Sequence, residues 1–299
     1  MTIGRLSSFL SYTNQYSKPF NEISNVAAEY ENAKASLRRI NDFLNLEDDS
    51  NNGDVFINDI ESIEFKDMSF SYNENQKLIE NLNLTIKKGQ KVAIVGPTGA
   101  GKTTLINLLM RFYDPNKGDI RFNGESCLRI NKNSLRTNVG MVLQDTWIFT
   151  GTIMDNIRYF KQDATDDEVK EAAKKAHVDI LIDTLPNGYF TNVNNKSGLS
   201  EGQRQMIAIA RVMLLNPQLV ILDEATSNID TRSEKLITDA FDQMMKEKTS
   251  IVIAHRLSTI EGADIIIVMK DGAVVETGNH KELMKKQGFY YSLYSSQYK

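Results

Sequence analysis

The pattern of hydrophobic positions divides the chain into a helical N-terminal part and a longer part in which strands and helices alternate. Residues 1–46 place apolar or aromatic side chains at spacings of three and four, which predicts one face of a helix. These positions are Phe9, Tyr12, Tyr16, Phe20, Ile23, Ala27 and Tyr30. Pro19 is expected to kink or divide this helix, because proline removes a backbone donor and clashes with the preceding turn. The polar stretch "LEDDSNNGD" then predicts a linker over residues 47–56.

From residue 57 onward the pattern is typical of an α/β protein. Short strands are expected in "IESIEFKDMSFSY" and "NLNLTI", and a polar, strand-poor middle with a helical run follows. The closing part returns to strand-then-helix units, including "LVILDEA", "SIVIAH" and "IIIVMKDGAVVETG". This alternation predicts a sheet rich in parallel strands with helices on both faces.

One segment carries the pattern of a phosphate-binding loop. In "AIVGPTGAGKTTL" four residues separate the first glycine from Gly-Lys-Thr, with an apolar strand before and a helical run after. The lysine of such a loop reaches the β- and γ-phosphates of a nucleotide, and the adjacent hydroxyl is a ligand for magnesium. The candidate nucleotide-binding residues are Gly96, Pro97, Thr98, Gly99, Ala100, Gly101, Lys102, Thr103 and Thr104, with Thr103 also a metal ligand.

Two adjacent carboxylates follow a second strand. "LVILD" ends in Asp223, and Glu224 comes next, so both are expected at the carboxyl edge of the sheet, where open α/β sheets bind ligands. Asp223 is a candidate magnesium ligand, and Glu224 is a candidate base that orients an attacking water. The alternative is that the pair only stabilises a helix N-terminus.

Composition narrows the possible partners. The 299 residues carry a formal net charge of -4, so the chain has no bulk attraction to nucleic acid, and no nucleic-acid partner is expected. The single cysteine excludes an internal disulfide and a cysteine-based metal cluster. No apolar run approaches the roughly 18 residues of a self-sufficient membrane span.

The segment "LSEGQRQMIAIAR" resembles the signature segment of the ATP-binding cassette (ABC) family. Other elements of that family occur in the expected order: the aromatic of "FSY", the glutamine of "MVLQD", then "SNID" and the histidine of "AHR". The resemblance covers residues 57–299. It implies a phosphate-loop NTPase fold of the ABC type, with an antiparallel β portion, a helical subdomain from about 146 to 215, and a long preceding helix.

The resemblance also implies roles for these residues. Tyr72 would stack on adenine, Gln144 would ligate magnesium or orient water, and His255 would contact the γ-phosphate as part of the catalytic set with Glu224 and Lys102. Two cassettes of this family pair head to tail, and signature residues of one cap the ATP held by the other. The corresponding residues are Ser200, Gly202 and Gln203.

One position departs from the common family form. Glu201 stands where "LSGGQ" has a second glycine, and a carboxylate facing a triphosphate would be repelled. We therefore expect a heterodimer with a second ABC subunit rather than a homodimer. The stretches "DEATSNIDTRSEK" and "GFYYSLYSSQY" resemble the catalytically competent subunit of bacterial heterodimeric exporters.

Residues 1–46 resemble the last transmembrane helix of an exporter with its cytoplasmic extension, so the chain is expected to be a truncated half-transporter. The helix is too polar to span a bilayer alone. The alternative is a soluble amphipathic helix docked on the cassette.

Together these features predict an ATPase that uses ATP and Mg²⁺ at the cytoplasmic face of the cell membrane and drives export of a lipophilic or drug-like substrate, as in multidrug efflux. Two alternatives remain. One is a soluble ABC-type ATPase of DNA repair or translation, and the other is a non-transport phosphate-loop NTPase such as a kinase or GTPase. The signature segment and the lack of an "NKxD" guanine-reading motif disfavour the latter.

Overall fold

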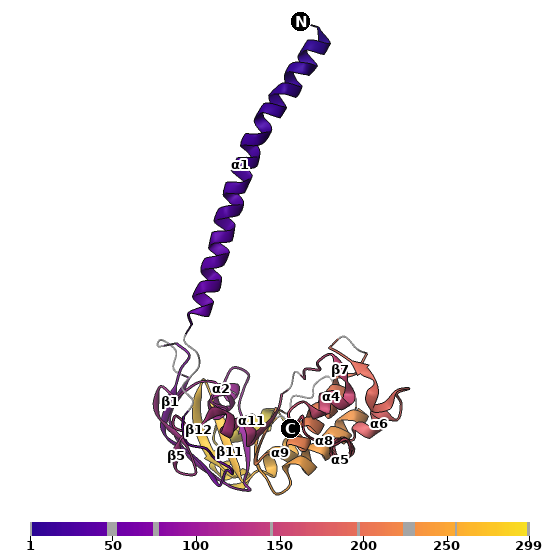
Figure 1. Ribbon diagram of the computed structural model, residues 1–299. Helices are drawn as coiled ribbons and strands as arrows, with labels where there is room; N and C mark the ends of the chain where they lie inside the picture. The colour runs from indigo at the N-terminus through magenta and orange to yellow at the C-terminus, as the bar shows by residue number, and fades with distance from the viewer. Residues whose placement is uncertain are drawn as a thin grey trace. The chain divides into compact units, whose positions relative to one another are not determined.

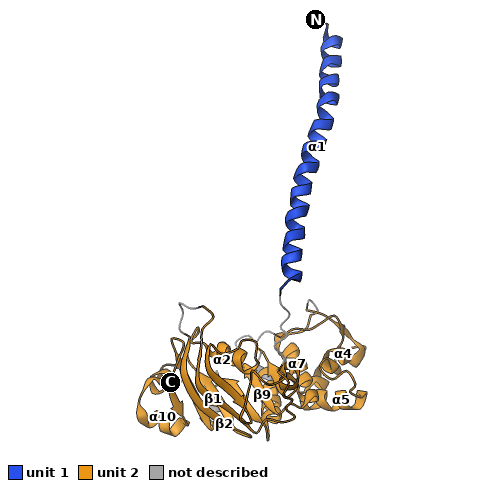
Figure 2. Cartoon of the chain, turned by 60° about the vertical axis from the view of Figure 1, so that its left-hand side comes forward, with its two compact units in different colours: residues 1–51 blue, residues 52–299 orange. Residues whose placement is uncertain are grey.

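The computed structural model describes residues 2–46, 53–73, 78–143, 146–195, 198–223, 231–254 and 256–297 (Figure 1). The chain forms two compact units, residues 1–51 and residues 52–299 (Figure 2).

Unit 1 consists of the long helix α1 (Ile3–Leu44). The expected division at Pro19 is wrong, because the helix continues through this residue and only bends along its length (Figure 1). No residue of α1 is buried, so water can reach the Gln15 carbonyl that loses its backbone partner at Pro19. Tyr16 and Phe20 pack one turn apart, with ring centroids 5.4 Å from each other. Within the described ranges, no helix combines the length and the apolar character needed to cross a lipid bilayer.

Unit 2 is built around a mostly parallel sheet. Its described strands follow the order β12-β11-β3-β10-β9-β6, and β12 alone among them runs antiparallel to its neighbour. The bounds are β3 Lys91–Val95, β6 Val139–Val142, β9 Leu219–Asp223, β10 Thr249–Ile253, β11 Ile265–Lys270 and β12 Ala273–Gly278. This sheet confirms the predicted strand-and-helix alternation.

A second, antiparallel sheet confirms the expected β portion near Tyr72. Its strand order is β2-β1-β4-β5. The bounds are β1 Ser62–Phe70, β2 Ile79–Lys87, β4 Lys117–Phe122 and β5 Glu125–Ser126. The expectation of a strand-poor middle is wrong here, because β4 pairs with β1 and buries Ile120 and Phe122. Its partner strand lies about 55 residues earlier, so local pattern alone does not indicate it.

The central sheet separates two hydrophobic cores, and β3 shows how. Val92 and Ile94 pack into the core shared with the antiparallel sheet, α2 (Lys102–Leu109) and α3 (Lys132–Thr137). Ala93 and Val95 point to the other face and pack into the core that contains the remaining helices of unit 2. Helices therefore cover both faces of the sheet, as the sequence predicts.

In chain order, the next helices of unit 2 form a group that lies away from β1 (Figures 1 and 2). This group, with two short strands, is α4 Ile153–Arg158, α5 Asp166–Lys175, α6 Val178–Ile182, α7 Glu201–Leu215, β7 Gly151–Thr152 and β8 Asn192–Val193. After it come α8 Thr231–Met245, α9 Leu257–Glu261, α10 His280–Lys286 and α11 Phe289–Gln297. Thr152, Thr165 and Ser200 each begin a helix with a reciprocal capping box, which explains why these helices start where they do.

Arg211 joins α7 to the segments before it. Its guanidinium donates to the Asn156 carbonyl from Nε and to the Trp147 carbonyl from Nη1, both at 2.7 Å. It also donates from Nη2 to Asn156 Oδ1. The side chain lies 5.9 Å from the centre of the Tyr159 ring. Burial lowers the pKa of Arg211 to about 10, so at neutral pH the group stays charged and its hydrogen bonds are charge-assisted.

We expect Arg211→Met to lower the free energy of unfolding by about 2–4 kcal/mol, because it leaves buried oxygen acceptors without their donor. Denaturant-induced unfolding measures this change. Arg211→Lys keeps the charge but not the forked geometry of the guanidinium. Its free energy of unfolding should lie between those of the unaltered chain and Arg211→Met. A loss of less than about 0.5 kcal/mol for the Met variant would show that this network contributes nothing to stability.

The single cysteine provides a second test of the fold. Cys127 is 1% exposed. Burial, together with the charge of Asp119, raises the pKa of Cys127 to about 11. At pH 8 we expect a disulfide reagent to react with the native thiol on the order of 10² times more slowly than with the chain unfolded in urea, where the thiol pKa is about 8.5. Similar rates in the two states would place Cys127 at the surface.

Candidate functional site

The phosphate loop connects β3 to α2 and owes its shape to glycine. A side chain at Gly96 would place its Cβ 2.3 Å from the Met269 carbonyl oxygen of β11, so only glycine fits. Gly101, the residue before α2, has a φ of 93°, a conformation that favours glycine. The free backbone N–H groups at the start of α2 follow directly, and such groups favour an anion.

Lys102 is held inside this loop. Its ammonium donates to the carbonyl oxygens of Gly96 at 2.7 Å and Pro97 at 3.0 Å. Burial lowers the pKa of Lys102, and the negative charge of Asp223 opposes that shift. The two carbonyl acceptors are neutral and do not cancel the ammonium charge, so this group suits an incoming phosphate oxygen.

The two predicted magnesium ligands that the structure describes lie together. Thr103 and Asp223 line one cavity of about 30 Å³ between the start of α2 and the end of β9. That volume corresponds to about one water molecule. Among the described residues no group of three His, Cys, Asp or Glu side chains could hold a metal. A hydroxyl and a carboxylate are oxygen ligands of the kind that Mg²⁺ takes, since it typically uses one or two carboxylates and completes its octahedron with water and phosphate oxygens.

Tyr72 lies beside the first turn of α2. Its hydroxyl donates to Thr104 Oγ1 and accepts from Asn107 Nδ2, each at 3.3 Å. Its ring is held edge-on by Phe70 and Tyr113, with centroids 5.0 Å away in both cases. The side chain is 43% exposed, which leaves surface on which a base could stack. Sequence reasoning did not include Tyr113, which is 41 positions further along the chain.

Gln144, Glu224 and His255 lie outside the described residues. In the sequence each comes just after a strand of the central sheet, namely β6, β9 and β10. These three strands are parallel neighbours, and their carboxyl ends meet at the edge that carries the phosphate loop.

The signature residues form a separate cluster at the start of α7. Ser200 Oγ accepts from the Gln203 backbone N–H at 3.2 Å, and Gln203 Oε1 accepts from the Ser200 N–H at 2.9 Å. Gly202 is buried in the same turn. In the part of the chain that the structure describes, no hydrogen bond joins residues 200–203 to the phosphate loop. The structure therefore does not bring the two halves of the predicted nucleotide site together within one chain.

Glu201 has a local explanation. It occupies the first turn of α7, where a carboxylate interacts favourably with the positive end of the helix dipole. Its side chain is half-buried. Glu201 can therefore stabilise α7 independently of any effect that it has on nucleotide binding.

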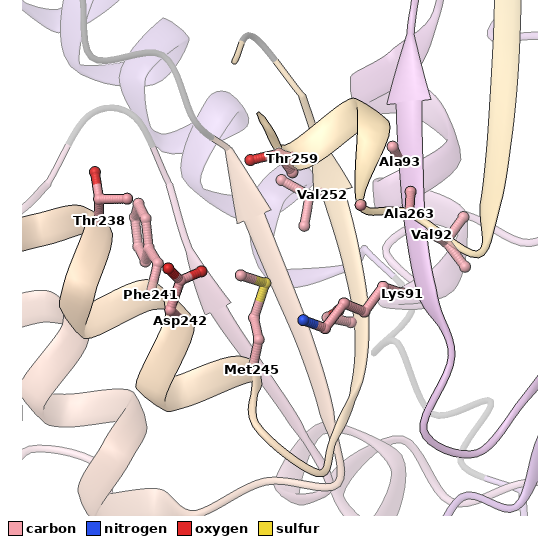
Figure 3. A pocket seen from close by; sticks show the side chains of 12 residues that line it. Lys91, Val92, Ala93, Thr238, Phe241, Asp242, Met245, Val252, Thr259 and Ala263 are labelled. Atoms are coloured by element: carbon pink, nitrogen blue, oxygen red, sulfur yellow. The ribbon is translucent and has the colours of Figure 1, made fainter. Parts of the chain in front are cut away.

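A different cavity, of about 210 Å³, lies at the opposite end of β3 (Figure 3). Lys91 and Val92 of β3 form part of its wall, and Phe241 and Met245 of α8 form another part. The phosphate loop follows the last residue of β3, whereas this cavity adjoins the first. It shares no lining residue with the cavities at the loop, so it is separate from the nucleotide site.

Comparison with known proteins agrees with this geometry. Residues 79–227 match the family model described as ABC transporter. The chain is 45% identical, over its full length, to half of an uncharacterized ABC transporter ATP-binding protein, YfiC, of Bacillus subtilis. It is 44% identical over 98% of its length to a fatty acid ABC transporter ATP-binding/permease protein of Mycobacterium bovis, of which it covers 47%. It is 40% identical over 99% of its length to a probable multidrug resistance ABC transporter ATP-binding/permease protein, YheH, of Bacillus subtilis, of which it covers 44%.

A solved structure gives the same result. The structure of a bacterial Atm1-family ABC exporter with ATP bound aligns with the whole chain at a TM-score of 0.80 and 34% identity, over 53% of that protein. The chain thus spans about half the length of the relatives it matches. The phosphate loop and the Thr103–Asp223 cavity agree with these matches. This chain therefore belongs to the ABC transporter family and carries its ATP-binding ATPase domain.

Proposed function

We propose that this chain is the ATP-binding and ATP-hydrolysing part of an ABC exporter. The observation that carries the proposal is the arrangement of Lys102, Thr103 and Asp223 around one loop. It places a half-buried cation near two oxygen ligands suited to Mg²⁺. Relatives named as fatty acid and multidrug resistance transporters support a lipophilic or drug-like substrate.

In this proposal each residue has one task. Lys102 exchanges its bonds to the Gly96 and Pro97 carbonyls for bonds to the β- and γ-phosphate oxygens. Thr103, Asp223 and Gln144 would hold Mg²⁺, which when bound neutralises phosphate charge. Tyr72 supports the base, and the backbone of residues 96–104 surrounds the phosphates.

The chemical step is an in-line attack of water on the γ-phosphate. Glu224 accepts a hydrogen bond from that water and orients it, and His255 donates a hydrogen bond to the γ-phosphate. Because the transferred group passes to water, the products are ADP and inorganic phosphate.

We further propose that a second ABC subunit completes the site. Ser200, Gly202 and Gln203 of one subunit would cap the ATP bound by the other, which agrees with their lack of bonds to the phosphate loop of their own chain. A heterodimer is favoured over a homodimer because Glu201 would bring a carboxylate toward the partner's triphosphate.

The transmembrane partner is inferred from exposed apolar surface. On α1, large apolar side chains such as Phe9 and Tyr12 are 62% and 71% exposed, and exposed apolar surface of this extent is typical of an interaction surface. We propose that residues 1–46 are the last transmembrane helix and its extension, that residues 47–56 are a linker, and that residues 57–299 form the cassette. This arrangement would hold the cassette at the cytoplasmic face of the cell membrane.

The cassette offers its own apolar surface for such a domain. Trp147, Phe149, Tyr159 and Phe160 form a chain of ring contacts with centroids 5.2–5.9 Å apart between successive rings. Trp147 and Phe160 are more than half exposed. Arg211 ties the backbone of Trp147 to α7, so a contact at this surface reaches the helix that begins with the signature residues.

ATP turnover per chain, measured against the concentration of the full chain, tests the proposal. A heterodimer predicts saturable ATP binding with negligible turnover at every concentration, whereas a homodimer predicts turnover that rises steeply with concentration. Turnover per chain that is substantial and independent of concentration would contradict the shared site.

A further inference from the structure

The short segment of residues 53–57 is bound to the body of unit 2 by its backbone. The Val55 N–H donates to the Arg129 carbonyl at 3.0 Å, and the Val55 carbonyl accepts from the Asn131 N–H at 2.7 Å. These two bonds make a parallel β-bridge. At Gly53 a Cβ would lie 1.9 Å from the Arg129 carbonyl oxygen, so this close approach requires glycine.

Two side chains, one from α3 and one from the residue that follows it, hold Ile57. Ser134 Oγ accepts from the Ile57 N–H at 2.7 Å and donates to the Ile57 carbonyl at 2.8 Å. Asn138 Nδ2 donates to the same carbonyl at 3.1 Å. We call residues 53–57 the docked segment, and we call Ser134, Asn138 and the loop of residues 128–131 the clasp.

The clasp is joined to β9, the strand that ends in Asp223. The Asn138 carbonyl accepts from the backbone N–H groups of Gln218 and Leu219, each at 3.0 Å. Leu219 is the first residue of β9, and the strand is buried from there up to Asp223. Because β9 is paired on both sides, with β6 and β10, it is a rigid element. A displacement of Asp223 along the strand therefore reaches Asn138.

The clasp is also joined to α2, the helix that carries Thr103. Arg111 lies just beyond the end of this helix, and its side chain is 1% exposed. Its guanidinium donates from Nη1 to the Ile130 carbonyl at 2.6 Å and from Nη2 to the Leu128 carbonyl at 3.2 Å. This buried cation fastens the loop that pairs with Val55 to the end of α2.

Both sides of the Thr103–Asp223 cavity therefore lead to the docked segment. The cavity lies between the start of α2 and the end of β9, and the opposite ends of these two elements both meet the clasp. Thr103 and Asp223, bound to one Mg²⁺–nucleotide complex, would fix the spacing of α2 and β9. The clasp joins the same two elements, so the two sites act on one spacing.

The docked segment has the low local stability that a two-state element needs. Asp54 and Phe56 are exposed, and Val55 and Ile57 are only half-buried. A segment with few buried contacts opens at a smaller free energy than the core of the fold does. A ligand that favours the docked form lowers the population of the open form.

We propose that Ser134 and Asn138 are positioning residues that couple the docking of residues 53–57 to the binding of ATP with Mg²⁺. The docked segment holds the clasp, the clasp holds the spacing of α2 and β9, and that spacing sets the Thr103–Asp223 pair. The coupling rests on the nucleotide binding proposed above. In the proposed exporter this segment follows the last transmembrane helix, so the coupling would carry ATP binding to that helix.

The test is hydrogen–deuterium exchange of the full chain, resolved to single amides, with and without saturating ATP and Mg²⁺. The Val55 and Ile57 amides should exchange about fivefold more slowly with ATP, which is the lower end of typical coupling. The Asp67 amide donates to Asn83 Oδ1 at 3.0 Å in the antiparallel sheet and should exchange at the same rate in both states. Unchanged exchange of Val55 and Ile57 in a chain saturated with ATP would overturn the coupling.

Because coupling is reciprocal, undocking the segment should weaken ATP binding by up to the same factor. Ser134→Ala removes a partner of the docked segment, and Gly53→Ala blocks its close approach to the loop. Each should weaken ATP binding about two- to fivefold in a calorimetric titration of the full chain. Ser134→Thr keeps the hydroxyl and should restore the affinity. Asn83→Ala removes a bond of the same kind outside the clasp and should leave the affinity unchanged.

An unchanged ATP affinity in both Ser134→Ala and Gly53→Ala would overturn the role of the clasp. An equal loss in Asn83→Ala would also overturn it, since that result indicates a general loss of stability. A full chain that binds no ATP would instead count against the proposed function. The two failures are distinguishable because ATP binding by the unaltered chain is measured directly.

Discussion

Lys102→Ala is expected to weaken ATP binding by about 10²-fold. The ammonium is the cation that the loop carries among its own residues, and each charge-assisted hydrogen bond to phosphate contributes about 1.5–3 kcal/mol. Two such bonds, less the cost of removing water from the ammonium and the phosphate, account for a loss of ATP affinity of this size. Isothermal titration of the full chain with ATP and Mg²⁺ measures the change.

Lys91→Ala is the matched control for this experiment. It removes an exposed lysine from the same strand, β3, but at the end away from the loop and beside the separate cavity (Figure 3). It should leave ATP affinity within twofold of the unaltered chain. If Lys102→Ala binds ATP as tightly as Lys91→Ala does, the phosphate-loop assignment is wrong.

Glu224→Gln is expected to lower kcat for ATP hydrolysis by about 10²–10⁴-fold, because an amide cannot accept a proton from the attacking water or polarise it as a carboxylate does. ATP affinity should change less than threefold, since the residue acts on water rather than on the nucleotide. The measurement is phosphate release by the full chain together with the second ABC subunit that completes its site.

Glu171→Gln is the control for Glu224→Gln, since Glu171 lies on α5 and its nearest ionic partner is Lys175 at 2.7 Å. This substitution should leave kcat unchanged. Turnover by Glu224→Gln at the rate of the control would remove Glu224 from the mechanism.

The parts of the site that lie close together in sequence were predictable. The phosphate loop and its flanking strand and helix occupy the consecutive residues 91–109, and the glycine spacing in "AIVGPTGAGKTTL" reflects local backbone requirements. The strand before Asp223 was also predictable, because a fully buried parallel strand is a short continuous apolar run.

Other features depend on contacts between distant segments, which local pattern does not encode. Strand β4 is stabilised by pairing with β1, and the Tyr72 ring is positioned by Tyr113. The sequence left open whether Pro19 kinks or divides the helix, and α1 stays continuous because an exposed helix can lose one backbone bond to water at modest cost.

The central claim is that this chain holds a nucleotide by its phosphates at residues 96–104. The most direct test is calorimetric titration of the full chain with AMP, ADP and ATP in the presence of Mg²⁺. The account predicts one site per chain, with negligible AMP binding, because α-phosphate contacts alone leave Lys102 and the Thr103–Asp223 pair unused. Equal affinity for all three nucleotides, or no saturable binding of ATP, would contradict it.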